Sequence, residues 1–278
     1  MTTKSKKTVE NLEKTLNKSS LVDSAEQLEL LIERAKKAQK IFATFTQEQV
    51  DAIFKAAATA ADKARIPLAR LAHEETGMGV LEDKIIKNHF ASEYIYNKHK
   101  HAKTCGVIKE DKANGIKVVA EPLGVIAGIV PTTNPTSTAI FKSLIALKTR
   151  NPIIFSFHPS AHESSKQAAI VIRDAAIAAG APENCIQWLS IKSMYATNAL
   201  MNHPGVATIL ATGGNAMVKA AYSCGKPALG VGAGNVPAYV EKTCVLPRAV
   251  NDIVLSKSFD NGMICASEQA AIVDQEIY

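Results

Sequence analysis

Apolar residues along the chain follow two different periods, and the change between them divides the chain into two sections. Over residues 24–100 they recur at three- and four-residue steps, as at Leu28, Leu31 and Ile32, which is the spacing of a buried helix face. Thr46 followed three residues later by Gln49 is a capping-box signal for a helix start. The first section is therefore predicted to be helical.

Two short β-rich runs separate the sections. They lie on either side of Ala113, Asn114 and Gly115 and predict a hairpin over about residues 105–121. Such a hairpin is either an edge element without a partner or an arm that joins subunits, and both interpretations stay open.

From Gly124 onward, short apolar runs alternate with helical segments. The runs read GVIAGIV, PIIFSF, CIQWL, VATIL and PALGV, and helices are expected from about Pro135, from His162, over SMYATNALM and over NAMVKAAYS. This alternation predicts an α/β fold, with a Rossmann-like parallel sheet and helices on both faces. Ligands of such sheets bind beyond the carboxyl ends of the strands, so the loops after the strands are the expected site.

The loops after the first two apolar runs carry polar side chains between prolines. In GIVPTTNPT, the Asn134 amide could donate an N–H to a developing oxyanion, or it could cap the helix that starts at Pro135. His158 closes the second run before Pro159. A loop histidine alone is more often structural than ligand-binding.

Two later loops are rich in glycine. Thr212, Gly213 and Gly214 stand between a strand and a helix, where a ligand can approach the backbone and the helix N-terminus favours an anion. The run GVGAGN has glycines spaced G-x-G-x-G, and the β-rich PAYV follows it where a dinucleotide fingerprint needs a helix. Its glycines are therefore expected to clear space for a ligand or for a backbone crossing.

Composition and charge exclude several classes of protein. The chain has 278 residues and a formal net charge of +6, and its densest basic run lies in a polar start that predicts a solvated tail over residues 1–23. Nucleic acid is not an expected partner. No run approaches the roughly 18 apolar residues of a membrane span, and the N-terminus lacks a signal-peptide core. A cytoplasmic protein without membrane contact is predicted.

One of the five cysteines has an unusual setting. The cysteines form no C-x-x-C pair, so neither a disulfide framework nor a metal site is predicted. Cys265 lies in SFDNGMICASEQ, a glycine-containing turn with small residues, just before a strand-like run, QAAIVD. The small neighbours leave its sulfur approachable.

Four motifs together resemble one family. PTTNPTSTAIFKSL, the His158–Pro159 turn, ATGGNAMVKAAYSCGKPALGVGAGN and SFDNGMICASEQ, in this order, resemble the coenzyme-A-acylating branch of the aldehyde dehydrogenase superfamily, and in particular the N-terminal half of its bifunctional aldehyde-alcohol dehydrogenases. The resemblance runs from about Ser24 to the last residue.

The resemblance implies a reaction and a set of site residues. It implies that the Cys265 thiolate adds to an aldehyde, that the Asn134 amide and a backbone N–H near Cys265 hold the oxyanion, and that NAD accepts the hydride. Coenzyme A then takes the acyl group, so acetaldehyde and acetyl-CoA are the implied substrates in a fermentation enzyme. The implied cofactor-binding residues are Ile129, Val130, Pro131, Thr132, Thr133, Asn134, His158, Thr212, Gly213, Gly214, Gly230 and Gly232.

Two departures from the wider superfamily bear on specificity. Hydrolytic members carry a glutamate general base where this chain has Gly230. Water, with a pKa of about 15.7, needs such a base, whereas a thiol near 8.5 partly ionises unaided, so thiolysis is predicted and a glutamate restored at 230 is expected to let water compete. His158 stands where many relatives have a lysine that contacts the adenosine ribose, so NAD is favoured over NADP only by the resemblance.

The family's catalytic domain continues past the nucleophile, so the chain is expected to be a fragment or a truncated product. The expected division is an NAD-binding domain over 24–243 and an incomplete catalytic domain over 244–278. Bifunctional relatives add an iron-dependent domain and form filaments, so iron is expected only in a missing C-terminal domain, and a homo-oligomer or filament is expected. The alternatives are a hydrolytic aldehyde dehydrogenase, glutamyl-phosphate-reductase-like chemistry on an acyl phosphate, and a non-catalytic nucleotide-binding or assembly fragment.

Overall fold

The centre of the molecule is a parallel sheet of five strands. The computed structural model describes residues 25–278, so the predicted tail over residues 1–23 lies outside the described residues. The strands occur in the order β5-β4-β3-β6-β7, and every neighbouring pair is parallel. Their bounds are β3 Val125–Val130, β4 Ile153–Phe157, β5 Ile186–Trp188, β6 Val206–Thr212 and β7 Ala228–Val231.

The apolar runs form buried strands because both faces of the sheet are covered. Every residue of β3 is buried. Ile126 and Val130 belong to one hydrophobic core, while Ala127 and Ile129 belong to the other, as the two-residue period of a strand requires. The prediction of a parallel sheet with helices on both faces is therefore confirmed.

Each face has its own set of helices. One core receives side chains mainly from α3, α4, α7 and α8, with Phe42 from the end of α2, and the other from the rest of α2 and from α9 and α10. Thr46 and Gln49 form the predicted capping box at the start of α3. The helix bounds are α2 Ala25–Phe42, α3 Gln47–Lys63, α4 Arg65–Thr76, α7 Pro135–Lys148, α8 His162–Ala178, α9 Met194–Asn202 and α10 Asn215–Tyr222.

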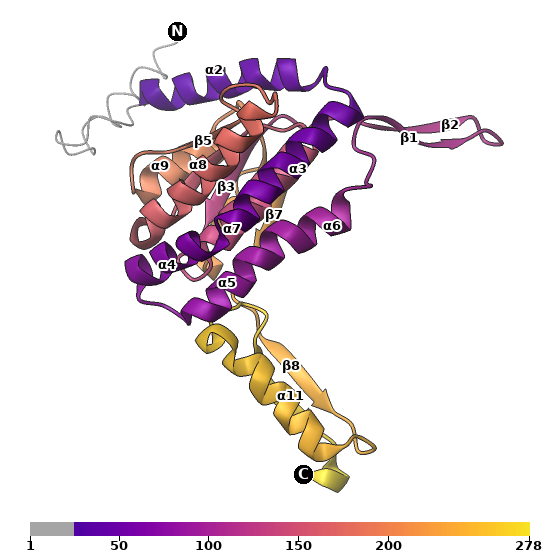
Figure 1. Cartoon of the computed structure of the whole chain (residues 1–278), viewed down its shortest axis with the longest axis vertical. Helices are drawn as coiled ribbons and strands as arrows, with labels where there is room; N and C mark the ends of the chain where they lie inside the picture. The colour runs from indigo at the N-terminus through magenta and orange to yellow at the C-terminus, as the bar shows by residue number, and fades with distance from the viewer. Residues whose placement is uncertain (1–24) are drawn as a thin grey trace.

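Two further segments connect α4 to β3 along the chain. The helical path continues through α5 (Leu81–His89), a π-helical turn η1 (Phe90–Tyr94) and α6 (Ile95–His99). The predicted hairpin follows as β1 (Gly106–Asp111) and β2 (Ile116–Ala120). It projects from the body (Figure 1), and nearly all of its strand residues are exposed.

The last segment, residues 232–278, forms a C-terminal lobe that projects from the body beneath α5 (Figure 1). It contains β8 (Val236–Val240), α11 (Leu246–Ser258), the short turn η3 (Phe259–Gly262), β9 (Glu268–Val273) and η4 (Gln275–Ile277). The QAAIVD run is a strand, as predicted, and it pairs in parallel with β8. β8 thus lies outside the five-stranded sheet, while the predicted boundary between 243 and 244 stays a prediction.

No helix within residues 25–278 combines the length and the apolar character that a membrane span needs.

Candidate active site

The loops singled out in the sequence lie at one edge of the sheet, because each follows a parallel strand at its carboxyl end. The backbone N–H of His158, after β4, donates to the Val130 carbonyl of β3 over 3.2 Å. The backbone N–H of Gly213, after β6, donates to the Val231 carbonyl of β7 over 3.1 Å. The fold therefore places these loops next to one another in pairs.

Cys265 lies in the turn that joins η3 to β9, and its surroundings are open. Of the five cysteines, all within residues 25–278, Cys265 is exposed, Cys185 is buried and the others are half-buried. Burial raises the pKa of the Cys185 thiol to about 12. The sulfur of Cys265 is thus the one that a reagent in solution reaches most readily.

Gly234 lies directly against the Cys265 turn. A Cβ atom at position 234 would lie 2.1 Å from the Cys265 carbonyl oxygen, far inside van der Waals contact. The expectation that this glycine clears space for a backbone crossing is confirmed, and the backbone that crosses is that of Cys265. The loop after β7 therefore sets the position of the cysteine turn.

Replacing Gly234 with alanine is expected to displace this turn, because a backbone atom cannot move aside as a flexible side chain can. The free energy of unfolding should fall by roughly 1–3 kcal/mol, and the rate at which iodoacetamide alkylates Cys265 should change. Gly214→Ala is the matched control, since a Cβ there meets nothing within 4 Å. An unchanged melting temperature together with an unchanged alkylation rate in Gly234→Ala would contradict the contact.

Asn134 approaches the same turn from the loop after β3. Its Nδ2 donates to the Met263 carbonyl over 3.3 Å and to Thr133 Oγ1 over 3.0 Å, and its Oδ1 accepts from Lys87 Nζ over 2.7 Å. The side chain makes no capping bond to α7. Asn134 therefore occupies the N-cap position of α7, as the cap interpretation expects, but its side chain does not cap the helix. Its amide instead lies beside the backbone two residues before Cys265.

A buried ion cluster supports this arrangement, and the sequence analysis missed it. Asp260 is fully buried, and its carboxylate pairs with Lys87 and with Lys84 of α5, the latter over 3.4 Å. The backbone N–H of Val80 donates to Asp260 Oδ1 over 2.8 Å. Asp260 stands in the quoted motif, and the lysines stand three residues apart on α5, but no local pattern shows that they meet.

Two lysines near the site have pKa values below the ordinary lysine value. Burial, with a smaller contribution from the Lys84 ammonium, lowers the pKa of Lys87, while Asp260 and Asp83 oppose the shift. Burial lowers the pKa of Lys142 to about 7. Lys142 donates to the Ile129 carbonyl over 2.5 Å and to the Leu210 carbonyl over 2.7 Å, so it ties together β3 and β6 beneath the site.

The loops after β3 and β6 offer groups that fit a nucleotide. Thr132 Oγ1 is buried without a hydrogen-bond partner among the described residues, which is unfavourable unless a ligand or water satisfies it. At the start of α10 no side chain caps the helix, and the space around Gly214 is open. Free N–H groups at a helix N-terminus bind phosphate well, so this loop suits a pyrophosphate.

His158 holds its own turn rather than reaching into the site. Its Nδ1 accepts from the Ser160 N–H over 3.2 Å, which caps the short turn η2 (Pro159–Ala161). The rest of the side chain is exposed. This contact supports the structural interpretation of His158 and leaves its face open to a ligand.

Gly230 lies in β7 against α10. The Tyr222 hydroxyl accepts from the Gly230 N–H over 3.0 Å and donates to the Gly230 carbonyl over 3.3 Å. A Cβ at position 230 would lie 2.7 Å from Val218 Cγ1 and 2.8 Å from Tyr222 Cε2. A side chain at this position therefore starts out toward α10, which the sequence did not reveal.

Gly230→Glu is accordingly expected to destabilise the protein before it can supply a general base. The free energy of unfolding should fall by roughly 1–3 kcal/mol, and Gly230→Ala should lose a similar amount, because the clash begins at Cβ. Thermal unfolding of the two variants checks this. A Gly230→Glu variant as stable as the unchanged chain would refute the packing argument and restore the simple expectation that water competes.

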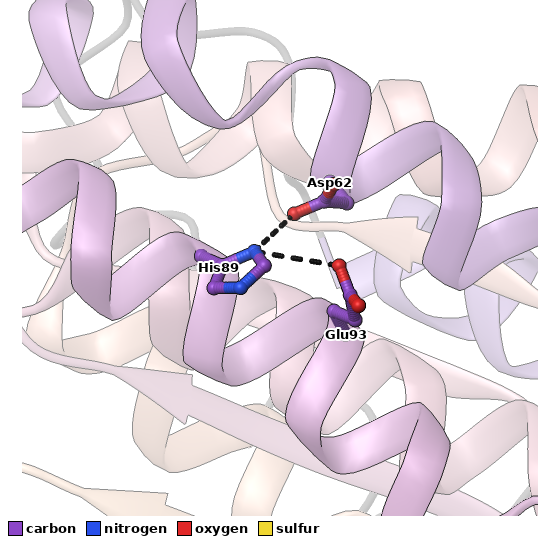
Figure 2. Close-up of side chains that lie close together, drawn as sticks. All are labelled: Asp62, His89 and Glu93. Atoms are coloured by element: carbon purple, nitrogen blue, oxygen red, sulfur yellow. Dashed lines mark hydrogen bonds and ion pairs between the residues drawn. The ribbon is translucent and has the colours of Figure 1, made fainter.

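A separate group of side chains offers possible metal ligands. Asp62, His89 and Glu93 converge on one point (Figure 2). His89 Nδ1 lies 2.7 Å from Asp62 Oδ1 and 3.6 Å from Glu93 Oε2, and Arg65 pairs with Asp62 Oδ2 over 3.0 Å. Because both carboxylates face one ring nitrogen and Arg65 already pairs with one of them, the cluster is explained as a polar network that joins α3 to α5 and η1.

Known proteins match the chain in sequence and in fold. The model of the aldehyde dehydrogenase family matches residues 4–278. The aldehyde-alcohol dehydrogenase of Streptococcus pneumoniae serotype 4 is 72% identical over 211 residues, which are 76% of this chain and 24% of that protein. The chain thus spans about a quarter of the length of such curated relatives.

Two crystal structures share the fold over most of the described residues. An acetylating aldehyde dehydrogenase from Geobacillus thermoglucosidasius superposes with a TM-score of 0.87 at 50% identity, covering 91% of this chain and 56% of that one. A propionaldehyde dehydrogenase from Rhodopseudomonas palustris, solved with bound CoA and an acylated cysteine, gives a TM-score of 0.79 at 35% identity and covers 90% of this chain and 57% of that one.

Proposed function

This chain belongs to the aldehyde dehydrogenase family, and we propose that it carries the nucleotide-binding part and the nucleophile of a CoA-acylating aldehyde dehydrogenase. The proposed reaction interconverts acetaldehyde plus CoA with acetyl-CoA. The observation that carries the proposal is the turn of Cys265, an exposed thiol that Gly234 and Asn134 approach from two loops at the carboxyl edge of the sheet.

Cys265 acts as the nucleophile in this proposal. Its thiolate forms a C–S bond to the aldehyde carbonyl carbon, and the carbonyl electron pair moves to oxygen, which gives a thiohemiacetal oxyanion. Loss of hydride from that carbon re-forms the carbonyl and leaves a thioester on Cys265. Attack by the CoA thiolate forms the new thioester and releases the Cys265 thiolate.

Asn134 serves as a donor to the oxyanion. Its Nδ2 carries two N–H groups, one of which makes the 3.3 Å contact with the Met263 carbonyl. A contact of this length is slightly longer than the usual range, so exchanging it for a bond to a new oxyanion beside Cys265 costs little. A donor fixed before charge develops stabilises the transition state more than the substrate.

The loops after β3 and β6 are proposed to bind the nucleotide, which supplies the hydride acceptor when bound. The start of α10 with Gly213 and Gly214 would hold the pyrophosphate, and Thr132 would satisfy its buried hydroxyl on the cofactor. The remaining candidates stay proposals: Ile129 and Val130 at the end of β3, Pro131 and Thr133 after it, and Gly232 after β7. NAD is proposed rather than NADP.

The choice of CoA over water follows from Gly230 in this proposal. No carboxylate stands there to activate water, and the residue packs on α10. A hydrolytic aldehyde dehydrogenase is the second candidate, and it needs such a base. The acyl enzyme is therefore proposed to wait for a thiol, which partly ionises near neutral pH without help.

The test measures NADH formation from acetaldehyde with and without CoA. Because the chain covers 56% of its acetylating relative, the assay uses an extended polypeptide, which contains this chain and continues to the full length of that relative. NADH formation that depends on CoA and yields acetyl-CoA is the expected result. Acetate without CoA would support the hydrolytic candidate, and no NADH under either condition would support a non-catalytic nucleotide-binding or assembly role.

Assembly is part of the same proposal. The β1–β2 hairpin exposes apolar side chains at Val107, Ile116 and Val119, and burying them against another subunit would remove apolar surface from water. We therefore propose the hairpin as an arm of a homo-oligomer or filament of a cytoplasmic enzyme. The molar mass in solution, with and without the hairpin, measures this.

A further inference from the structure

Lys87 is the side chain of α5 that reaches Asn134. Its side chain is only 10% exposed, and its ammonium donates to two acceptors, Asn134 Oδ1 over 2.7 Å and Asp260 Oδ2. Asn134 follows β3, while Asp260 lies five residues before Cys265 in the C-terminal lobe. One buried cation therefore links the proposed oxyanion donor to the segment that carries the proposed nucleophile.

The ammonium decides which way the Asn134 amide faces. An amide presents an oxygen acceptor on one side and an NH₂ donor on the other, whereas a lysine ammonium only donates. If the amide were turned over, its NH₂ would face the ammonium, and both groups would lose a hydrogen-bond partner in a buried place, which is unfavourable. Lys87 thus holds Oδ1 toward α5 and leaves Nδ2 directed to Met263 and the Cys265 turn.

Asp260 fixes Lys87 in this position. Its carboxylate is itself held by the Val80 N–H over 2.8 Å, and its backbone N–H donates to Asp83 Oδ2 over 2.7 Å. A Cβ at Gly79 would lie 2.1 Å from Asp260 Oδ1, so the close approach requires glycine there. With the carboxylate fully buried and held on several sides, Lys87 has little freedom to leave Asn134.

The need for a cation beside the Asp260 carboxylate does not by itself explain why Lys87 lies there. Lys84 already lies 3.4 Å from the same carboxylate oxygen, and its side chain, 2% exposed, is more deeply buried than that of Lys87. Lys84 also approaches the Thr133 carbonyl at 3.5 Å, the limit of a hydrogen bond, and makes no contact with Asn134 among its described bonds. The two lysines share a carboxylate and differ in the contact with Asn134, so they form a matched pair for experiment.

We propose that Lys87 is a positioning residue for the oxyanion donor: it orients the Asn134 amide toward Cys265, and Asp260 holds it in place. This inference rests on the proposed function. Lys87 does not touch the substrate in this account. It acts only through Asn134, and that property separates it from a residue that merely stabilises the fold.

The test is a double-mutant cycle. Its variants are made in the extended polypeptide of the NADH assay and measured with acetaldehyde, NAD and CoA. Lys87→Met is expected to lower kcat by about 10- to 100-fold, because a misdirected donor loses transition-state stabilisation, while the KM for acetaldehyde changes much less. In an Asn134→Ala background, Lys87→Met should cost little more, since the amide it orients is gone. Lys84→Met should lower the melting temperature at least as much as Lys87→Met and lower kcat far less.

Several outcomes would overturn the inference. Equal losses of kcat in Lys84→Met and Lys87→Met, or a full additional loss for Lys87→Met in the Asn134→Ala background, would reduce Lys87 to a structural cation. If Lys87→Met does not fold, Lys87→Ala, which likewise carries no side-chain donor, takes its place in the same cycle and is judged in the same way. Failure of the proposed function is distinct, because the unchanged protein would then show no CoA-dependent NADH formation.

Discussion

Cys265→Ala is expected to abolish CoA-dependent aldehyde oxidation, with kcat reduced by roughly 10⁴- to 10⁶-fold, the range seen when a catalytic nucleophile is removed. No neighbouring group can replace the C–S bond that the thiol forms. Cys265→Ser should be almost as inactive, because a hydroxyl is far less ionised than a thiol near neutral pH. Turnover of acetaldehyde measures both, and NAD binding should remain nearly unchanged because the nucleotide loops are untouched.

The assignment of Cys265 can also be checked on this chain without an activity assay. Iodoacetamide should label Cys265 first, because Cys105, Cys224 and Cys244 are half-buried and Cys185 is buried. Peptide mapping of the first alkylated site reads this directly. Earlier labelling of Cys224, or an alanine variant that keeps more than a small fraction of the turnover, would remove Cys265 from the proposed role.

Asn134→Ala is expected to lower kcat by about 100- to 1,000-fold, the usual cost of one oxyanion donor, with a much smaller change in the KM for acetaldehyde. The amide matters only once negative charge builds on the carbonyl oxygen, so the ground-state complex loses little. Steady-state kinetics at saturating NAD and CoA separate the two parameters.

Asn134→Ser is the matched control for the helix-cap interpretation. Serine is as good a cap residue as asparagine, but it lacks the amide and is too short to keep the contacts with Lys87 and Met263. The serine variant should therefore be as impaired as the alanine variant. Wild-type turnover in Asn134→Ser would instead show that Asn134 serves only to cap α7.

The glycines illustrate what a local pattern can and cannot tell. The spacing of Gly230, Gly232 and Gly234 and the β-rich run after them correctly excluded a dinucleotide fingerprint, since β8 follows. The pattern did not show what each glycine avoids. Gly234 leaves room for the Cys265 carbonyl, and Gly230 leaves room for Val218 and Tyr222. The first contact depends on how the loop after β7 packs against the Cys265 turn, and the second depends on how β7 packs against α10.

The ion cluster around Asp260 shows the same limit more strongly. Lys84 and Asp260 are 176 residues apart in the sequence, and the contact between Gly79 and Asp260 spans a similar separation. Each residue has an ordinary local explanation: lysines on a helix are usually solvated, and an aspartate in an Asp-Asn-Gly run usually belongs to a turn. The fold buries them together, and burial makes their pairing necessary.

The sequence by itself determined the elements and the edge at which the site forms. Continuous apolar runs between helical segments specify buried parallel strands, the capping box specifies the start of α3, and a parallel sheet collects its carboxyl-end loops on one side. Only the tertiary structure decided that the Asn134 side chain bonds Lys87 and Met263 instead of the N–H groups of α7, and that β8 lies outside the sheet and pairs with β9. Periodicity and turn chemistry act within a few residues and can be read locally, whereas the partner of a buried polar group is set by which distant segments pack together.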